Sequence, residues 1–330
     1  MARAIVHIGY HKTASTWFQK SVYPRVKNFA YVPRERVNHA LLDASALHFD
    51  AERSRAQLAL PEGAAPILCE EALSGALLSG GFLGFQSAEI ARRIHALLPD
   101  ARIVVFVRSQ PEMITAAYLQ YLRVGGTYSA RRFLWPSDYS RADATVPYRE
   151  PHFSFDHFDY DRLVAHYIAL FGAERVHAYA YEELRRDGPV FLERFAKELG
   201  LELDLAAVTM EKRNASYGLA VSRMARALNL FTALRVSNKH YWLHVPYWYA
   251  ARKRLLEGAN ASGVFRARAT PERVLGSETV AWIRQRYCES NRRLAELTRI
   301  DLRALGYALD PPASPARRPA VGILQRWASR

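Results

Sequence analysis

The stretch that indicates the fold of this chain most clearly is Ala4-Ile-Val-His-Ile-Gly-Tyr-His-Lys-Thr-Ala-Ser-Thr-Trp-Phe-Gln-Lys20. Its first residues are mostly β-forming and apolar, which predicts a buried strand. Gly9 permits a tight exit from that strand, and the pattern becomes helical from Thr16 onward. The N–H groups and the dipole of a first helical turn favour negative charge, so strand, small-residue turn and helix start together predict an anion site.

The turn between strand and helix does not follow the Walker A pattern, because His11 and Val6 occupy its two glycine positions. What remains is Gly9-x-x-Lys12-Thr13-Ala14-Ser15-Thr16, which resembles the 5′-phosphosulfate loop of sulfotransferases that use 3′-phosphoadenosine 5′-phosphosulfate (PAPS). The form His-x-Gly-x-His-Lys-Thr-Ala-Ser-Thr is similar to that of bacterial carbohydrate-type members. A simple helix cap needs one hydroxyl residue rather than a run of them, so we expect anion binding here.

Length and composition set limits on the class of protein. The 330 residues are half apolar, and a chain of this length lies near the upper limit for one core. We expect one sulfotransferase domain over residues 1–310 and a basic, disordered tail over 311–330, where Pro, Ala and Arg dominate. Cys69 and Cys288 match no metal or redox spacing, which predicts two free thiols.

The charge balance indicates the kind of partner. Lys and Arg number 46 against 32 Asp and Glu, a net charge of +14 with neutral His. This excess favours a nucleotide, an acidic glycan, nucleic acid or an anionic membrane face, without selecting among them. No apolar run approaches the roughly 18 residues of a membrane helix. The first predicted strand starts at residue 4, which leaves no room for a signal peptide, so we expect a cytoplasmic protein.

Helical and strand patterns alternate through the middle of the chain. Residues 102–108 form a continuous apolar run between two arginines, typical of a parallel strand covered on both faces. Shorter strands are predicted at 64–71 and 175–181, and helices at 112–122, 160–171, 188–199 and 279–298, with Ser87 capping a further helix. We interpret 31–66 as short helices and loops, and 135–158 as a long active-site loop. The predicted fold is α/β, a three-layer sandwich with a central parallel sheet; the resemblance makes it P-loop NTPase-like.

The resemblance to PAPS-dependent sulfotransferases extends over most of residues 4–310 and implies a nucleotide site without a metal. Arg108, after the central strand, resembles the arginine that grips the 3′-phosphate. The family's serine for the same phosphate would fall at residue 116, where this chain has Ala116; Thr115 is adjacent but would point elsewhere on a helix. The loop from Arg213 to Ser216 resembles a second nucleotide contact. The implied PAPS-binding residues are His11, Lys12, Thr13, Ala14, Ser15, Thr16, Arg108, Arg213 and Ser216.

Sulfuryl transfer requires positioning, neutralisation of charge on the leaving phosphate and removal of the acceptor proton. Lys12 suits the second task. For the base we favour Glu70, which follows a predicted strand and therefore lies at the carboxyl edge of the sheet. Glu71 and His11 stay open as rivals. Two histidines of the long loop, His152 and His157, are candidates for contact with the acceptor.

The acceptor that the resemblance implies is a hydroxyl group of a carbohydrate or glycolipid. One alternative is a P-loop-like nucleotide kinase, although no Asp that could hold magnesium follows a strand in the expected way. The other is a basic, non-catalytic protein that binds glycan, membrane or nucleic acid through Lys239–Arg254, where aromatic and basic residues mix. We expect no specific nucleic acid, and a peripheral contact with the inner membrane through 239–254.

Overall fold

The computed structural model describes residues 3–60, 63–139, 152–210, 217–236, 239–262, 267–312 and 316–319. The chain divides into two compact units. Unit 1 comprises Met1–Ser109, Asp156–Arg213 and Tyr287–Leu309, and unit 2 comprises Gln110–Phe155, Asn214–Arg286 and Asp310–Arg330. The long helix α14 (Ser277–Thr298) contributes residues to both units, as does the short 3-10 turn at Phe155–Phe158.

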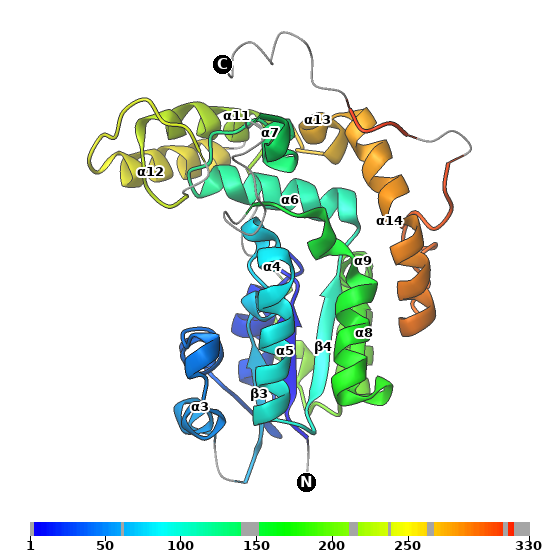
Figure 1. The fold of residues 1–330 in the computed structure, drawn as a ribbon. Helices are drawn as coiled ribbons and strands as arrows, with labels where there is room; N and C mark the ends of the chain where they lie inside the picture. The colour runs from blue at the N-terminus through cyan, green and yellow to red at the C-terminus, as the bar shows by residue number, and fades with distance from the viewer. Residues whose placement is uncertain are drawn as a thin grey trace. The chain divides into compact units, whose positions relative to one another are not determined.

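Unit 1 is built on a five-stranded parallel sheet. The strands are β1 (Ile5–Gly9), β2 (Phe29–Tyr31), β3 (Ala65–Cys69), β4 (Arg102–Val107) and β5 (Val176–Ala180). Their order across the sheet is β2-β3-β1-β4-β5, so the first strand of the chain lies in the middle (Figure 1). Its Ile5 is in register with Ile67 of β3 and with Arg102 of β4. The predicted α/β fold with a central parallel sheet is confirmed.

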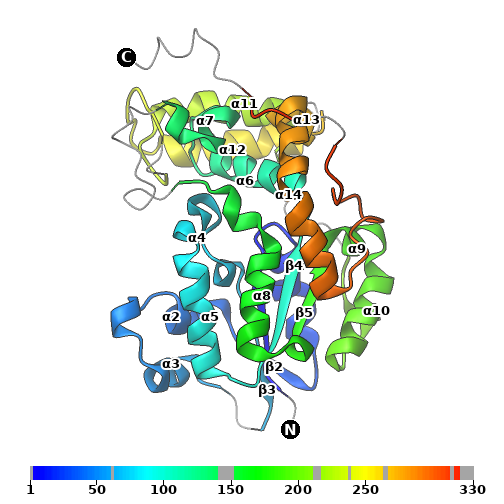
Figure 2. The ribbon, with the colours of Figure 1, turned by 45° about the vertical axis from the view of Figure 1, so that its right-hand side comes forward.

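Helices cover both faces of this sheet, which makes three layers. Helices α5 (Phe85–Leu97) and α8 (Tyr160–Phe171) lie side by side on one face, and α10 (Gly188–Leu199) lies on the other (Figures 1 and 2). Side chains alternate across a strand, so Ile5 points toward α10 while its neighbour Val6 is buried under the opposite layer. Both faces are apolar because both are covered.

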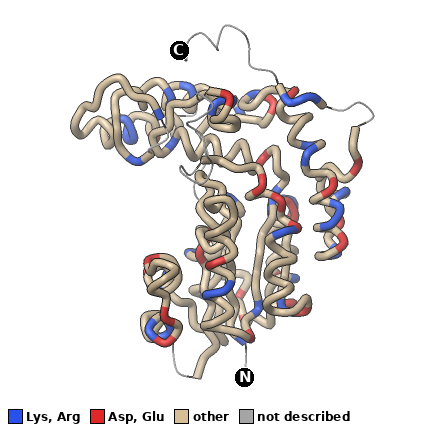
Figure 3. The backbone as a smooth tube through the Cα atoms, viewed as in Figure 1, with Lys and Arg blue, Asp and Glu red and all other residues tan. Residues whose placement is uncertain are grey.

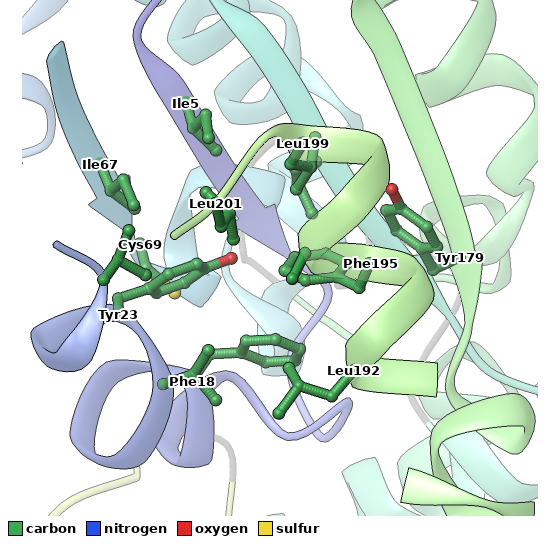
Figure 4. Close-up of a cluster of buried hydrophobic side chains, with 14 of the residues drawn as sticks. Ile5, Phe18, Tyr23, Ile67, Cys69, Tyr179, Leu192, Phe195, Leu199 and Leu201 are labelled. Atoms are coloured by element: carbon green, nitrogen blue, oxygen red, sulfur yellow. The ribbon is translucent and has the colours of Figure 1, made fainter. Parts of the chain in front are cut away.

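The core beneath α10 is rich in aromatic side chains. Phe18 and Phe195 lie with ring centroids 5.2 Å apart, and Leu192 and Leu199 of α10 extend this contact along the sheet (Figure 4). Phe18 belongs to a helical segment made of α1 (Ser15–Trp17), a π-helical turn (Phe18–Val22) and a 3-10 turn (Tyr23–Arg25). The apolar residues that follow the predicted anion loop (Gly9–Thr16) therefore anchor that loop to the core.

The rest of unit 1 is short elements, and two of them correct the sequence analysis. The segment 31–66 contains α2 (Arg34–Leu41) and α3 (Ala51–Leu58), as expected, but Phe29–Tyr31 adds the edge strand β2. Ser87 is not the cap of α5, because the helix starts at Phe85 and the Ser87 hydroxyl donates to the Ser74 carbonyl at 2.8 Å. The other elements are α4 (Gly80–Leu83) and α9 (Tyr181–Arg186).

Unit 2 is helical in its described part. It contains α6 (Gln110–Arg123), α7 (Ala130–Leu134), α11 (Leu219–Leu228), α12 (Trp248–Ala261), α13 (Pro271–Leu275) and the first turns of α14. The expected active-site loop at 135–158 starts with a 3-10 turn at Pro136–Tyr139 and ends with another at Phe155–Phe158. Residues 140–151 of that loop, and 313–315 and 320–330 of the expected tail, lie outside the described residues.

The carboxyl end of α6 is capped by three polar side chains from the segment after α11. Asn229 Nδ2 donates to the carbonyls of Leu122 and Gly126 at 2.8 and 2.6 Å. Lys239 Nζ donates to the carbonyl of Gly125 at 3.2 Å, and Arg252 Nη2 to that of Arg123 at 2.7 Å. Cations at this end also offset the negative end of the helix dipole.

These caps change the interpretation of Lys239–Arg254. Arg252 is 1% exposed and Lys239 is also buried, so neither cation is available on the surface. Burial, and next the nearby Arg252, lower the pKa of Lys239 to about 8. The surface charge of this segment therefore comes from Lys253 and Arg254 alone.

Charged residues occur on most elements of both units (Figure 3). Within the described residues, no helix combines the length and the apolarity that a membrane span requires. Cys69 and Cys288 are both buried and form no disulfide with each other, in agreement with the prediction of two thiols.

Candidate functional site

The loop that follows β1 is shaped by a close approach to the loop after β3. Gly9 has φ +105°, and a Cβ at this position would lie 3.0 Å from the Glu71 carbonyl oxygen and 3.1 Å from its Cα. A larger residue would collide with main chain, which explains why glycine ends the strand. The next residue, Tyr10, donates its N–H to the Phe106 carbonyl at 2.9 Å, which ties the loop to β4.

Four consecutive main-chain donors follow in this loop. Among the hydrogen bonds of the described residues, none uses the N–H groups of 13–16 as donors. Ala14, at the start of α1, has φ 71° and ψ 15°, which is the left-handed conformation. Where left-handed and right-handed residues alternate, successive main-chain N–H groups point toward the same side. Such a concave set of N–H groups at the start of a helical segment binds anions.

The hydroxyl groups of the loop have partners within the protein. Thr13 is buried and donates to the Tyr10 carbonyl at 2.5 Å. Ser15 is also buried, and its hydrogen bond to Glu71 helps to lower the pKa of that carboxyl. Thr16 is partly exposed. The backbone of 13–16 and Thr16 are thus better placed to receive a phosphate than the hydroxyls of Thr13 and Ser15.

Lys12 and His11 supply the charge and the polarity of the loop. Both side chains are partly exposed, and Lys12 has φ 64°, a left-handed conformation. Burial lowers the pKa of His11 to about 4, Glu71 opposes this shift, and Lys12 and Arg34 add to it. His11 is therefore neutral at pH 7, and Lys12 is the cation of the loop.

Two carboxylates and one guanidinium meet where β3 ends. Glu70 is fully buried and accepts hydrogen bonds from Nε of Arg34, from Nη2 of Arg34 at 3.0 Å and from the Ala72 N–H at 3.0 Å. The same Nη2 lies 3.4 Å from Oε1 of Glu71, whose Oε2 accepts from Gln19 at 3.2 Å. Arg34 thus bridges the favoured base and its rival.

The surroundings shift the pKa values of Glu70 and Glu71 in opposite directions. Burial raises the pKa of Glu70, although the Ala72 N–H and Arg34 oppose the shift. The pKa of Glu71 is lowered: burial, the largest influence, raises it, but Arg34, His11 and Ser15 together outweigh burial. A carboxylate has about four lone-pair sites, so the three bonds to Glu70 leave one on Oε2 for a proton. A raised pKa is the property expected of a base that works near neutral pH.

Arg34 is the site residue that the sequence analysis missed. It follows β2, an edge strand of three residues that the sequence analysis did not predict. The signal was present as Phe-Ala-Tyr-Val at 29–32 followed by Pro33, a short apolar run with a breaker behind it. Because β2 is parallel to β3, both strands end at the same edge of the sheet.

Arg108 follows β4 and lies beside the anion loop. Its Nη1 donates to the Lys12 carbonyl at 3.2 Å, and its guanidinium lies 5.1 Å from the centre of the Tyr181 ring. The Tyr160 hydroxyl donates to the Arg108 carbonyl at 2.8 Å, which holds the end of β4 in place. The structure therefore brings together the two residues that the resemblance assigns to the two phosphates of the donor.

The two histidines predicted to contact the acceptor belong to different units. His157 is buried in unit 1, where its ring centroid lies 5.4 Å from that of Tyr10. Burial lowers the pKa of His157 to about 3, with His11 adding to the effect, so His157 is neutral at pH 7. Its Nε2 makes no hydrogen bond to any described residue. His152 belongs to unit 2 and is not among the residues that unit 1 brings together.

The other predicted residues belong to unit 2 or lie outside the described residues. Ala116 and Thr115 are buried in α6 of unit 2, and the Thr115 hydroxyl donates to the Pro111 carbonyl at 2.7 Å. Arg213 and Ser216 lie outside the described residues. No cluster of three or more His, Cys, Asp or Glu side chains in the described part of the chain could hold a metal ion.

The residues of unit 1 converge at one place in the topology. The anion loop follows β1, Glu70 and Glu71 follow β3, and Arg108 follows β4. From β1 the chain first builds β2 and β3 on one side and then β4 and β5 on the other. In open parallel sheets, such a switch point is where ligands bind, outside the carboxyl ends of the strands.

No family model matches this chain, and no curated protein matches its sequence significantly. Among solved structures, a sulfotransferase from Alicyclobacillus acidocaldarius is 17% identical, over 70% of this chain and 94% of that chain, with a TM-score of 0.46. The sulfotransferase domain from the curacin biosynthetic pathway is 12% identical, over 79% and 98%, with a TM-score of 0.38.

A mouse sulfotransferase, SULT7A1, solved as a complex with PAP, is 13% identical over 92% of this chain and 87% of that chain, with a TM-score of 0.34. At these identities and TM-scores the similarities do not assign the chain to a family.

Proposed function

We propose that this protein transfers a sulfuryl group from PAPS to a hydroxyl group of a carbohydrate or glycolipid. The proposal includes a sulfotransferase domain over 1–310, followed by the tail at 311–330, and a cytoplasmic setting. It also includes Arg213 and Ser216 as further nucleotide contacts. The observation that carries the proposal is the loop after β1: four main-chain N–H groups, at 13–16, that donate to no described residue and lie beside Lys12 and Arg108. This set matches a phosphosulfate donor that carries a second phosphate.

The reaction is an in-line displacement at sulfur. The bond between sulfur and the bridging oxygen of the 5′-phosphate breaks while the acceptor oxygen bonds to sulfur. Lys12 stabilises the charge that develops on the leaving phosphate, and the N–H groups of 13–16 hold that phosphate in place. Glu70 takes the proton of the acceptor hydroxyl at Oε2, while Arg34 holds its carboxylate in one orientation. The products are a sulfate ester and adenosine 3′,5′-bisphosphate (PAP).

Binding of PAP without magnesium is the direct test of this proposal. A ligand that binds only the folded state at ~100 times its dissociation constant adds about 2.7 kcal/mol to the free energy of unfolding. We expect a clear rise in the melting temperature of the full chain with PAP. Stabilisation by ATP only with magnesium would instead indicate a nucleotide kinase, and no stabilisation by any of these nucleotides would refute the proposal.

Selectivity for the 3′-phosphate tests the role of Arg108. We expect the parent to bind PAP more tightly than adenosine 5′-phosphate, and Arg108→Ala to reduce this preference by roughly tenfold or more, since it removes a charged hydrogen-bond donor. Arg102→Ala, at the opposite end of β4, is the control and should leave the preference unchanged.

The same affinities in two further variants test the rest of the predicted 3′-phosphate site. Ala116→Ser should increase the preference if α6 supplies the missing hydroxyl, and Arg213→Ala should reduce it. Equal affinities for the two nucleotides in the parent would rule out a 3′-phosphate site.

A further inference from the structure

We propose that residues 240–247 of unit 2 are a docking loop for an anionic lipid surface. All eight residues of this docking loop are exposed, and six of them are aromatic, aliphatic or proline. Tyr247 is 91% exposed, Trp242 is 76% exposed and Leu243 is 60% exposed. An ordered loop that exposes this much apolar surface in one run marks an interaction site.

The exposure is built into the loop, because its main chain is held at several points. Trp242 N–H donates to the Leu230 carbonyl at 2.8 Å, and Val245 N–H to the Phe231 carbonyl at 3.1 Å. Before the loop, Lys239 is fixed to the cap of α6, as described above. At its start, the His240 N–H donates to the Thr127 hydroxyl at 2.9 Å, and that hydroxyl lies 2.8 Å from the His240 carbonyl.

The hydrogen bonds of Trp248, directly after the loop, complete this anchoring. Its indole Nε1 donates to the Leu228 carbonyl at 2.9 Å, which fixes the start of α12 against the end of α11. Both ends and the middle of the loop are bound to unit 2, and the side chains of Trp242 and Tyr247 nevertheless remain largely exposed. Trp242 meets the Phe231 ring edge-on, with ring centroids 6.1 Å apart, and this contact leaves most of the indole accessible to solvent.

The described part of unit 2 that carries the docking loop has a positive charge balance. Five exposed cations lie on the described residues from 217 to 262: Arg223, Arg226, Arg235, Lys253 and Arg254. The carboxylate in the same ranges is Glu257, which lies 3.9 Å from Lys253. This balance complements an anionic surface, toward which each nearby cation contributes attraction.

The chemistry favours a lipid surface over a protein groove or a nucleic acid. Tryptophan and tyrosine have an apolar body and a polar edge, and they concentrate at the boundary between lipid and water. Leucine, valine and proline offer no flat ring on which a base can stack, whereas they add to apolar burial between lipid headgroups. The docking loop combines the aromatic, aliphatic and cationic parts of such an interfacial anchor. This inference stands independently of the proposed sulfuryl transfer.

Co-sedimentation of the full chain with vesicles tests the docking loop. We expect binding to vesicles of phosphatidylcholine with phosphatidylglycerol and much weaker binding to phosphatidylcholine alone. Trp242→Ala combined with Tyr247→Ala should lower the affinity roughly tenfold or more for each side chain removed. Lys253→Gln combined with Arg254→Gln should lower it about fivefold for each cation at low salt. The matched control is Leu47→Ala with Phe85→Ala, which removes two exposed apolar side chains of unit 1.

Fluorescence gives a second readout that does not depend on the amount bound. Brominated lipids should quench the parent when it is bound, and Trp242→Phe should remove most of that quenching while vesicle binding largely persists. Quenching that is unchanged in Trp242→Phe would overturn the proposal, as would equal binding of the Trp242/Tyr247 double variant and the parent.

Two further outcomes would assign the docking loop to another partner. If the parent sediments with single-stranded oligonucleotides and not with vesicles, the loop is a nucleic-acid surface. If the double variant converts a dimer into a monomer in analytical ultracentrifugation, the loop is an interface between copies of the chain. Either result, without vesicle binding, overturns the lipid proposal.

Discussion

Replacing Lys12 by alanine is expected to lower the turnover of sulfuryl transfer by roughly 100- to 1,000-fold, the loss that follows removal of one preorganised charge-stabilising group. Binding of PAP should weaken much less, because the main-chain N–H groups of 13–16 remain. The reason is that Lys12 acts chiefly on charge that develops on the leaving phosphate in the transition state. Single-turnover rates with labelled PAPS and binding of PAP, measured on the same preparations, separate the two effects.

Lys20→Ala is the control for this experiment. Lys20 lies in the same helical segment and is exposed, so its removal changes the net charge equally without touching the loop. Equal losses of turnover in the two variants would show that general electrostatic attraction, and not the position of Lys12, supports the reaction. A loss of PAP binding as large as the loss of turnover would assign Lys12 to ground-state binding.

Replacing Glu70 by glutamine should lower turnover by roughly 100-fold or more while PAP binding persists, since the amide keeps the shape but cannot take a proton. Glu35→Gln is the control, an exposed carboxylate in the first turn of α2 next to Arg34. If Glu71→Gln or His11→Ala gives the large loss and Glu70→Gln does not, the assignment of the base is wrong.

The pH profile of turnover distinguishes the same candidates without a mutation at the base. A base must be ionised, so the rate falls as the pH drops through its pKa. For Glu70, whose pKa burial raises above the ordinary 4.5, this fall occurs above pH 4.5. For Glu71, whose pKa is lowered, and for His11, at about 4, it would occur below pH 4.5. Arg34→Met removes a hydrogen bond that lowers the pKa of Glu70, so it should shift the fall to still higher pH.

Most of the sheet could be predicted from the sequence because buried parallel strands are continuous apolar runs. The run at 102–108 and the alternation at 175–181 became β4 and β5 with nearly the predicted bounds. The strand β2 was missed because it has only three residues, and too few apolar positions existed to show a period. Because β2 was not predicted, Arg34 could not be placed at the carboxyl edge of the sheet, where it contacts Glu70.

The start of α5 and the burial of Arg252 depend on tertiary contacts, which local sequence patterns do not show. Ser87 is a residue type typical of a helix cap, yet its hydroxyl donates to the Ser74 carbonyl, and the helix starts at Phe85 with Gly84 in the cap position. Arg252 lies in a basic run of the sequence, which is typical of a solvated surface. Its side chain is nevertheless buried and donates to the Arg123 carbonyl at the end of α6. No local pattern shows such a use, because its partner, Arg123, is remote in the sequence.

The central place of β1 governs when the anion loop can exist. This strand is the first to be synthesised, but its two neighbours, β3 and β4, come much later in the chain. The loop gains its contact with Glu71 only after β3, and its contact with Arg108 only after β4. A nascent chain that ends before Val107 therefore contains the residues of the loop but lacks the contact with Arg108. A ligand of this loop could therefore stabilise the nascent chain only after β3 and β4 have both been synthesised and have paired with β1.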